Sequence, residues 1–200
     1  MIGAPGPESL SSPRLSRSIT PSLIDPTAPS SSTPNRERIQ CADAGPSTGT
    51  PVCDSSTQDV APLGYLSVRR KFTNNSGADV TRLRFRIIEI TNITNAGGLA
   101  PPVADLRAIS SPGSGGNPNV SLSVNTGLGP IDVYRTVLEM PSAQSVGGGI
   151  NSSLSAGSIT LANPLPAAGT AEQRSINLQL LLGVKALGRF SFFVVIEALP

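Results

Sequence analysis

Apolar side chains recur at every second position in several short segments of this chain. Residues 66–72 alternate leucine, valine and phenylalanine with serine, arginine and lysine, and residues 82–87 alternate arginine with leucine, phenylalanine and isoleucine. A repeat of two residues is typical of a β-strand with one buried face, because successive side chains of a strand point to opposite sides. The Asn- and Gly-containing turn at 74–79 predicts that these two strands form either a hairpin or a pair that crosses between sheets.

Further strand-like segments follow, separated by clusters of Gly, Pro and Asn. We expect strands at 103–109, 120–124, 133–140, 150–154, 158–161, 176–182 and 190–197. The last of these is apolar on both faces, which predicts a central strand rather than an edge strand. Many short strands without a helical repeat predict an all-β, immunoglobulin-like antiparallel β-sandwich. Its predicted core consists of Leu66, Val68, Phe72, Leu83, Phe85, Ile87, Ile159, Leu178, Leu180, Phe190, Phe192, Val194 and Ile196.

Residues 1–60 differ from the rest of the chain, because they are rich in Ser, Pro and Thr and contain only isolated apolar residues. Such a segment buries too little apolar surface to offset the entropy lost when its backbone is ordered. We therefore expect an extended linker or docking segment at 1–60 and a sandwich at 61–200. Within the first segment, residues 18–20 and 22–24 are flanked by prolines that favour extended backbone, and we expect them to lie along a sheet edge.

The composition argues against most kinds of catalytic chemistry. The chain has no histidine, so it contains no imidazole base and no histidine metal ligand. Its acidic residues are scattered and do not form a calcium-loop pattern. We therefore predict a non-enzymatic protein with no catalytic, cofactor-binding or metal-binding residues and no cofactor. A net charge of +2 without a dense Lys/Arg stripe also argues against nucleic-acid binding, and no apolar stretch is long enough for a transmembrane helix.

Two features bear on the compartment. Cys41 and Cys53 are the only cysteines, and they are close enough in sequence to form a local disulfide in an oxidising compartment; two free thiols are the alternative. The opening residues 1–7 lack the basic and apolar regions of a secretory signal. The chain is therefore expected to be cytosolic or to belong to a longer protein whose signal lies upstream.

Five basic side chains occupy the polar positions of the first two predicted strands: Arg69, Lys71, Arg82, Arg84 and Arg86; Arg70 adjoins the first two. If the two strands are neighbours, these side chains form one basic face that can bind anionic polysaccharide or lipid headgroups. The alternative is a solvated sheet face whose charges prevent pairing with other chains.

Several stretches of this sequence resemble the C-terminal module of long bacterial surface proteins built from Ig-like repeats. They are Leu66–Ile87, Gly147–Leu154 and Phe192–Pro200, and Ile2–Pro7 with Ser11–Pro13 is similar to the segment that precedes that module. The resemblance implies an extracellular or cell-surface location, a β-rich stalk and an export signal far upstream. It supplies no catalytic residues, and the cysteine-containing insert departs from its pattern.

These observations favour a non-enzymatic extracellular structural or adhesive β-sandwich module of a bacterial surface protein. Its expected partners are neighbouring Ig-like domains, identical subunits or surface polysaccharide. One alternative is a self-assembling filament subunit whose N-terminal segment donates a β-strand to a neighbour. A further alternative is a carbohydrate-binding module, although Tyr65 and Tyr134 alone supply few aromatic rings for sugar stacking.

Overall fold

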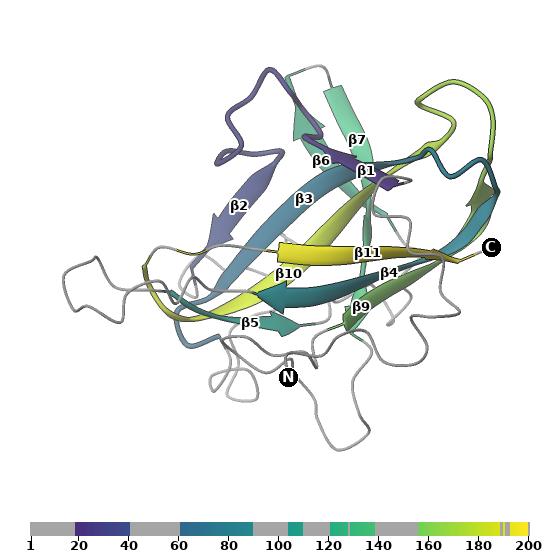
Figure 1. Ribbon diagram of the computed structural model, residues 1–200. Helices are drawn as coiled ribbons and strands as arrows, with labels where there is room; N and C mark the ends of the chain where they lie inside the picture. Colours follow the sequence, from purple (N-terminus) through teal and green to yellow (C-terminus); the bar gives the residue numbers. More distant parts are fainter. Residues whose placement is uncertain are drawn as a thin grey trace.

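The computed structural model describes residues 19–40, 61–89, 104–109, 121–127, 129–138, 156–188, 190 and 193–199. In these residues all regular secondary structure is β, and it forms two sheets that pack face to face (Figure 1). The predicted all-β, immunoglobulin-like antiparallel sandwich is thereby confirmed. The predicted strand at 150–154 lies outside the described residues.

Sheet A contains seven strands in the described part of the chain. They are β1 (Ile19–Ser22), β2 (Arg36–Ile39), β3 (Tyr65–Asn74), β5 (Asp105–Ile109), β6 (Leu122–Thr126), β7 (Gly129–Arg135) and β10 (Ser175–Ala186). Strands β3 and β10 form its antiparallel centre. One edge of β10 is shared by β5 and by β7, and the β10–β7 contact is parallel. The opposite edge of β3 is shared by β1 and β2.

Sheet B has the order β11 (Phe193–Leu199), β4 (Val80–Glu89), β9 (Ala156–Leu165) and β8 (Val137–Leu138). Because β3 belongs to sheet A and β4 to sheet B, the turn between them crosses from one sheet to the other. Of the two arrangements considered for these strands, the sheet-crossing pair is therefore correct.

The prediction that the last strand is central is wrong, because β11 lies at an edge of sheet B and pairs only with β4 among the described strands. Its inner face packs on the core through Val194, Ile196 and Ala198. On its outer face, Glu197 is buried beside Arg84 of β4. The ion pair with Arg84 thus buries Glu197 on the outer face of β11, although β11 has only one neighbouring strand among those described.

The main core lies between the sheets, where Phe72 of β3 meets Phe85 of β4 with ring centroids 4.9 Å apart. Burial of side chains this large contributes about 2–3 kcal/mol each. Eight predicted core residues are buried: Leu66, Val68, Phe72, Leu83, Phe85, Ile159, Leu178 and Leu180. Three more are partly buried against the core, namely Phe190, Val194 and Ile196. The side chain of Ile87 and the whole of Phe192 lie outside the described residues.

Candidate functional site

The N-terminal segment is part of sheet A. Residue Ile19 pairs with Asn74 and Ser22 with Lys71, and further along the same edge of β3 Arg36 pairs with Val68. Strands β1 and β2 therefore form one interrupted edge strand, with a loop at residues 23–35 between its halves (Figure 1). The predicted docking is confirmed for residues 19, 20 and 22, residue 18 lies outside the described residues, and residues 23 and 24 belong to the loop. Strand pairing thus begins well before residue 61.

Apolar contacts hold both β1 and the loop of this docked segment. The side chain of Ile19 is only 1% exposed and belongs to the main core, so β1 contributes to the sandwich interior. In the loop, Ile24 is buried against Val124 and Val133 of the β6–β7 pair. The loop therefore packs on a second part of sheet A instead of projecting into solvent.

Hydrogen bonds from one buried amide close the loop. The side chain of Asn35 is fully buried; its Oδ1 accepts from the backbone N–H of Asp25 at 3.0 Å, and its Nδ2 donates to the Asp25 carbonyl at 2.8 Å. The Asp25 carboxylate in turn accepts from the hydroxyl and the backbone N–H of Thr27, and these bonds hold the pKa of Asp25 below its ordinary value. Strands β1 and β2, which both pair with β3, are thereby joined by a loop that its own hydrogen bonds hold in place.

On the outer face of sheet A, β2 is joined to the sheet centre through Arg69 of β3. This guanidinium is 3% exposed, pairs with Glu37 of β2 at 2.5 Å and donates to Gln179 of β10 at 2.8 Å. Because a buried charge is costly unless it is paired and hydrogen-bonded, docking of Glu37 helps to hold Arg69 in place.

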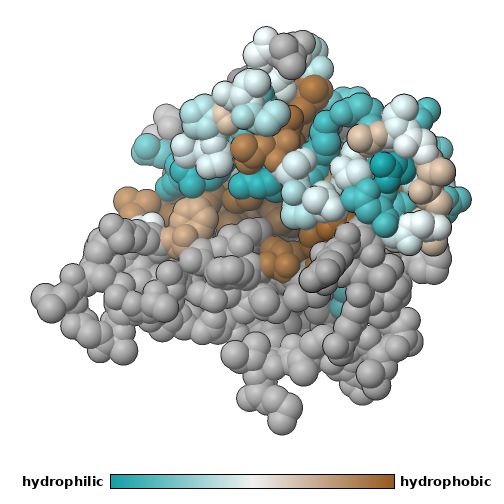
Figure 2. All heavy atoms as spheres, turned by 45° about the horizontal axis from the view of Figure 1, so that its top comes forward, coloured by the Kyte–Doolittle hydropathy of each residue, from teal (hydrophilic) through white to brown (hydrophobic). Residues whose placement is uncertain are grey.

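A cavity of about 390 Å³ lies between the sheets, next to the docked segment. Its apolar wall consists of Val68, Phe72 and Leu180 from sheet A together with Phe190, Val194 and Ile196 from the chain around β11. Pro21, Ser30, Arg36 and Arg70 complete the lining. In Figure 2 the top of Figure 1 is turned toward the viewer, and hydrophobic residues lie there between hydrophilic ones.

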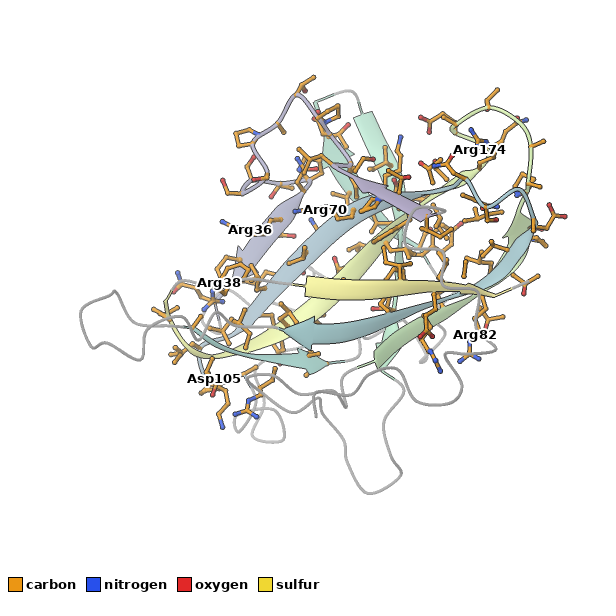
Figure 3. The ribbon with its side chains drawn as sticks, in the orientation of Figure 1. Arg36, Arg38, Arg70, Arg82, Asp105 and Arg174 are labelled. Carbon is orange, nitrogen blue, oxygen red and sulfur yellow. The ribbon has the colours of Figure 1, made fainter. Side chains whose placement is uncertain are left out.

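Two arginines border this cavity from different segments, Arg36 from β2 and Arg70 from β3 (Figure 3). The Arg36 guanidinium lies over the Phe190 ring, 5.8 Å from its centroid. The Arg70 side chain donates through Nη1 to the carbonyls of Asn35 at 3.1 Å and Arg69 at 2.6 Å. Burial, and then the nearby charge of Arg36, lower the pKa of Arg70. No carboxylate among the described residues forms a salt bridge with either guanidinium.

The structure does not bring the predicted basic face together. Since Phe72 and Phe85 point into the core, Arg69 and Lys71 lie on the outer face of sheet A, while Arg82 and Arg84 lie on the outer face of sheet B. The expectation of one shared face assumed neighbouring strands, and it is wrong because the intervening turn crosses between the sheets.

Ion pairs engage three of these predicted residues. Arg69 pairs with Glu37 as described above, Lys71 pairs with Glu172 at 2.9 Å, and Arg84 pairs with Glu197 at 2.5 Å. Figure 3 shows Arg82 well away from Arg36 and Arg70. Arg86 lies in β4, and its side chain is outside the described part of the structure.

The other predicted features have different outcomes. Cys41 and Cys53 lie outside the described residues, so their disulfide stays a prediction. Tyr65 is fully buried and Tyr134 packs partly against the core, so neither ring is freely available for sugar stacking.

Within the described ranges, no three His, Cys, Asp or Glu residues gather where they could hold a metal, and no helix there is long and apolar enough to cross a membrane.

The position of neither cavity arginine on the inner face was predicted from the sequence, for different reasons. Arg70 has the same strand parity as Leu66, Val68 and Phe72, so its position on the apolar face could have been noticed from the alternation. Arg36 lies in a Pro- and Ser-rich segment and acquires its place only by pairing with Val68 of β3. No local pattern predicts that pairing.

No family model, no curated protein and no solved structure matches this chain. The resemblance to a terminal module of bacterial surface proteins therefore stays a prediction.

Proposed function

We propose that this chain is a non-enzymatic structural or adhesive β-sandwich module, located outside the cell as part of a bacterial surface protein. The observation that supports this function best is the docked N-terminal segment, in which β1 and β2 cover the edge of β3. A long open strand edge pairs readily with other chains, whereas short edge strands that carry proline or charged residues, such as β1 and β2, reduce such pairing. A module that covers this edge with its own chain can present its outer faces and loops to other molecules.

Antibody labelling of intact cells of the source organism tests the location. The expected result is labelling of intact cells and removal of the epitope by added protease, as for a surface protein. A strain that lacks the chain is then expected to adhere less to a surface or to other cells, and expression of the chain restores adherence. Epitopes that become accessible only after lysis, or unchanged adherence of the deletion strain, would contradict the proposal.

Strand donation between copies is a second candidate function, and one specific observation favours it. The short strand β1 pairs with the edge of β3 and contributes Ile19 to the core. A strand donated by a neighbouring chain completes a sheet in the same way. Because a neighbouring copy could supply the same strand to the same edge, exchange between copies would produce chains of subunits.

Light scattering of the full-length chain over a range of concentrations distinguishes the two functions. A monomer at all concentrations supports the self-capped module, whereas polymers that grow with concentration support strand donation. The variant Ile19→Asp places a charge where β1 enters the core, so it should abolish such polymers. Its circular dichroism shows whether the remaining β-structure is retained. Polymers that persist in this variant would exclude donation by β1.

A further inference from the structure

The cavity beside the docked segment combines two chemical properties. Its apolar wall contains the side chains of Phe72, Leu180 and Val194, while Arg36 and Arg70 place two positive charges on its lining. Its volume of about 390 Å³ falls within the 300–1,000 Å³ of pockets that bind small ligands. An occupant that matches both properties has an apolar body and an anionic end.

The two arginines retain hydrogen-bonding capacity for such an anion. Within the described part of the chain, Arg70 donates hydrogen bonds only through Nη1, and the Arg36 side chain donates none. Guanidinium groups bind carboxylate and phosphate oxygens with paired N–H donors. An anion between the two would also offset their mutual repulsion, which contributes to the lowered pKa of Arg70.

Position in the fold favours a ligand over a solvated charge pair. In the antiparallel ladder Arg36 is opposite Val68, and paired residues share a face, so Arg36 is directed to the inner side of sheet A. Arg70 lies on that inner face between Val68 and Phe72. Two half-buried cations on the inner side of a sandwich, without an acidic partner among the described residues, are an unusual arrangement that an anionic ligand would stabilise.

We infer that this cavity binds a single-chain amphiphile, whose alkyl chain lies among Phe72, Leu180, Phe190 and Val194 and whose anionic head pairs with Arg36 and Arg70. Fatty acids and single-chain alkyl phosphates share this chemistry. The cavity shares Pro21 and Arg36 with the docked segment, but ligand binding and cell-surface adherence are measured separately, so each proposal can fail separately.

Isothermal titration calorimetry of the full-length chain with decanoate, below its micelle concentration, tests the inference. Decyl phosphate tests the alternative anionic head, decanol has the tail without charge, butyrate has the head with a short tail, and decyltrimethylammonium reverses the charge. The expected result is saturable binding of decanoate, decyl phosphate or both, at least about tenfold tighter than that of the other three compounds. The ratio between the two anions identifies the preferred head.

Variants then locate the binding. Arg36→Gln and Arg70→Gln are each expected to weaken binding by about tenfold or more, because each removes charged hydrogen-bond donors. Lys185→Gln removes an exposed positive charge at the end of β10 and should leave affinity unchanged. Val194→Phe fills the cavity and should abolish binding while thermal unfolding shows a retained fold.

Three results would overturn the inference. They are the absence of saturable binding, equal affinities for decanoate and decanol, and equal effects of the Lys185 and Arg70 substitutions in variants whose unfolding temperatures match that of the wild-type chain.

Discussion

The substitution Asn35→Ala tests whether the docked segment is an integral part of the sheet. The two shortest hydrogen bonds of the amide, at 3.0 and 2.8 Å, both involve the buried backbone of Asp25 and have normal lengths. Its contacts to the carbonyls of Ala28 and Pro29, at 3.3 and 3.4 Å, are weaker. Loss of the first two bonds leaves the buried N–H of Asp25 unsatisfied and leaves its carbonyl with only the longer bond from the Ala28 N–H, at 3.3 Å, which together costs about 3 kcal/mol. The backbone bond from Arg69 to the Asn35 carbonyl is not removed.

Hydrogen exchange of the full-length chain measures this effect where it is expected. A loss of about 3 kcal/mol raises the open population of β1 and β2 by about a hundredfold, so their amides should exchange faster by that factor. Amides at the centre of β10 should change less if the segment undocks locally. Ser32→Ala, which removes an exposed hydroxyl from the same loop, should change exchange by less than threefold, within about 0.5 kcal/mol. Equal exchange in Asn35→Ala and wild type would refute the reasoning.

Three further outcomes are expected. Ile19→Ala removes a fully buried core side chain and should lower the free energy of unfolding by about 3 kcal/mol, so an unchanged urea midpoint would disprove its role. Hydrogen bonds from Thr27 lower the pKa of Asp25, so the charged carboxylate stabilises the folded state. This stabilisation is fully present above the ordinary pKa of 3.8 and is lost as the pH falls through the lowered pKa. Urea midpoints should therefore depend less on pH in Asp25→Asn than in wild type below about pH 5, and parallel profiles would count against this. Arg84→Ala removes the ion pair with buried Glu197 and should cost about 3 kcal/mol in thermal unfolding, whereas a cost below about 0.5 kcal/mol would show that the pair is dispensable.

The strands that could be predicted from the sequence are those whose burial pattern is local. Leu66, Val68 and Phe72 alternate with polar residues because one face of β3 meets the opposite sheet and the other does not. The same reasoning identified β10 through Leu178 and Leu180. Alternation specifies which side of a strand is buried, and it therefore predicted much of the core without any knowledge of strand order.

Strand order depends on contacts between distant residues, and there the local pattern was insufficient. The apolar character of the last segment suggested two neighbouring strands, but the structure places β11 at an edge. Its inner face contacts the core and the cavity, and the buried Glu197 is paired by Arg84 of β4. Burial by the opposite sheet and burial by neighbouring strands both require apolar residues, so composition alone cannot distinguish them.

Strand β2 is the clearest case of a strand specified by its partner. Its sequence is Arg36-Glu37-Arg38-Ile39, in which three of the four residues are charged and only Ile39 is of a type enriched in strands. It becomes a strand because the edge of β3 offers backbone partners and because Glu37 pairs with Arg69. The position of Arg36 in the cavity could not be predicted for the same reason, since it follows from this pairing.

The docked segment and the cavity are physically coupled, because Arg36 comes from the segment and Arg70 from the body of the sheet. The inferred anion site is therefore complete only when β2 is paired. By thermodynamic linkage, a ligand that binds only the docked state must stabilise docking by the same free energy that docking contributes to binding. Asn35→Ala should accordingly weaken ligand binding as well as docking, whereas Arg70→Gln, which removes only one hydrogen bond to the Asn35 carbonyl, should weaken binding more than docking. If Arg70→Gln leaves ligand binding unchanged while Asn35→Ala behaves as expected, the ligand site is refuted. The account of the docked segment at the edge of β3 is then unaffected.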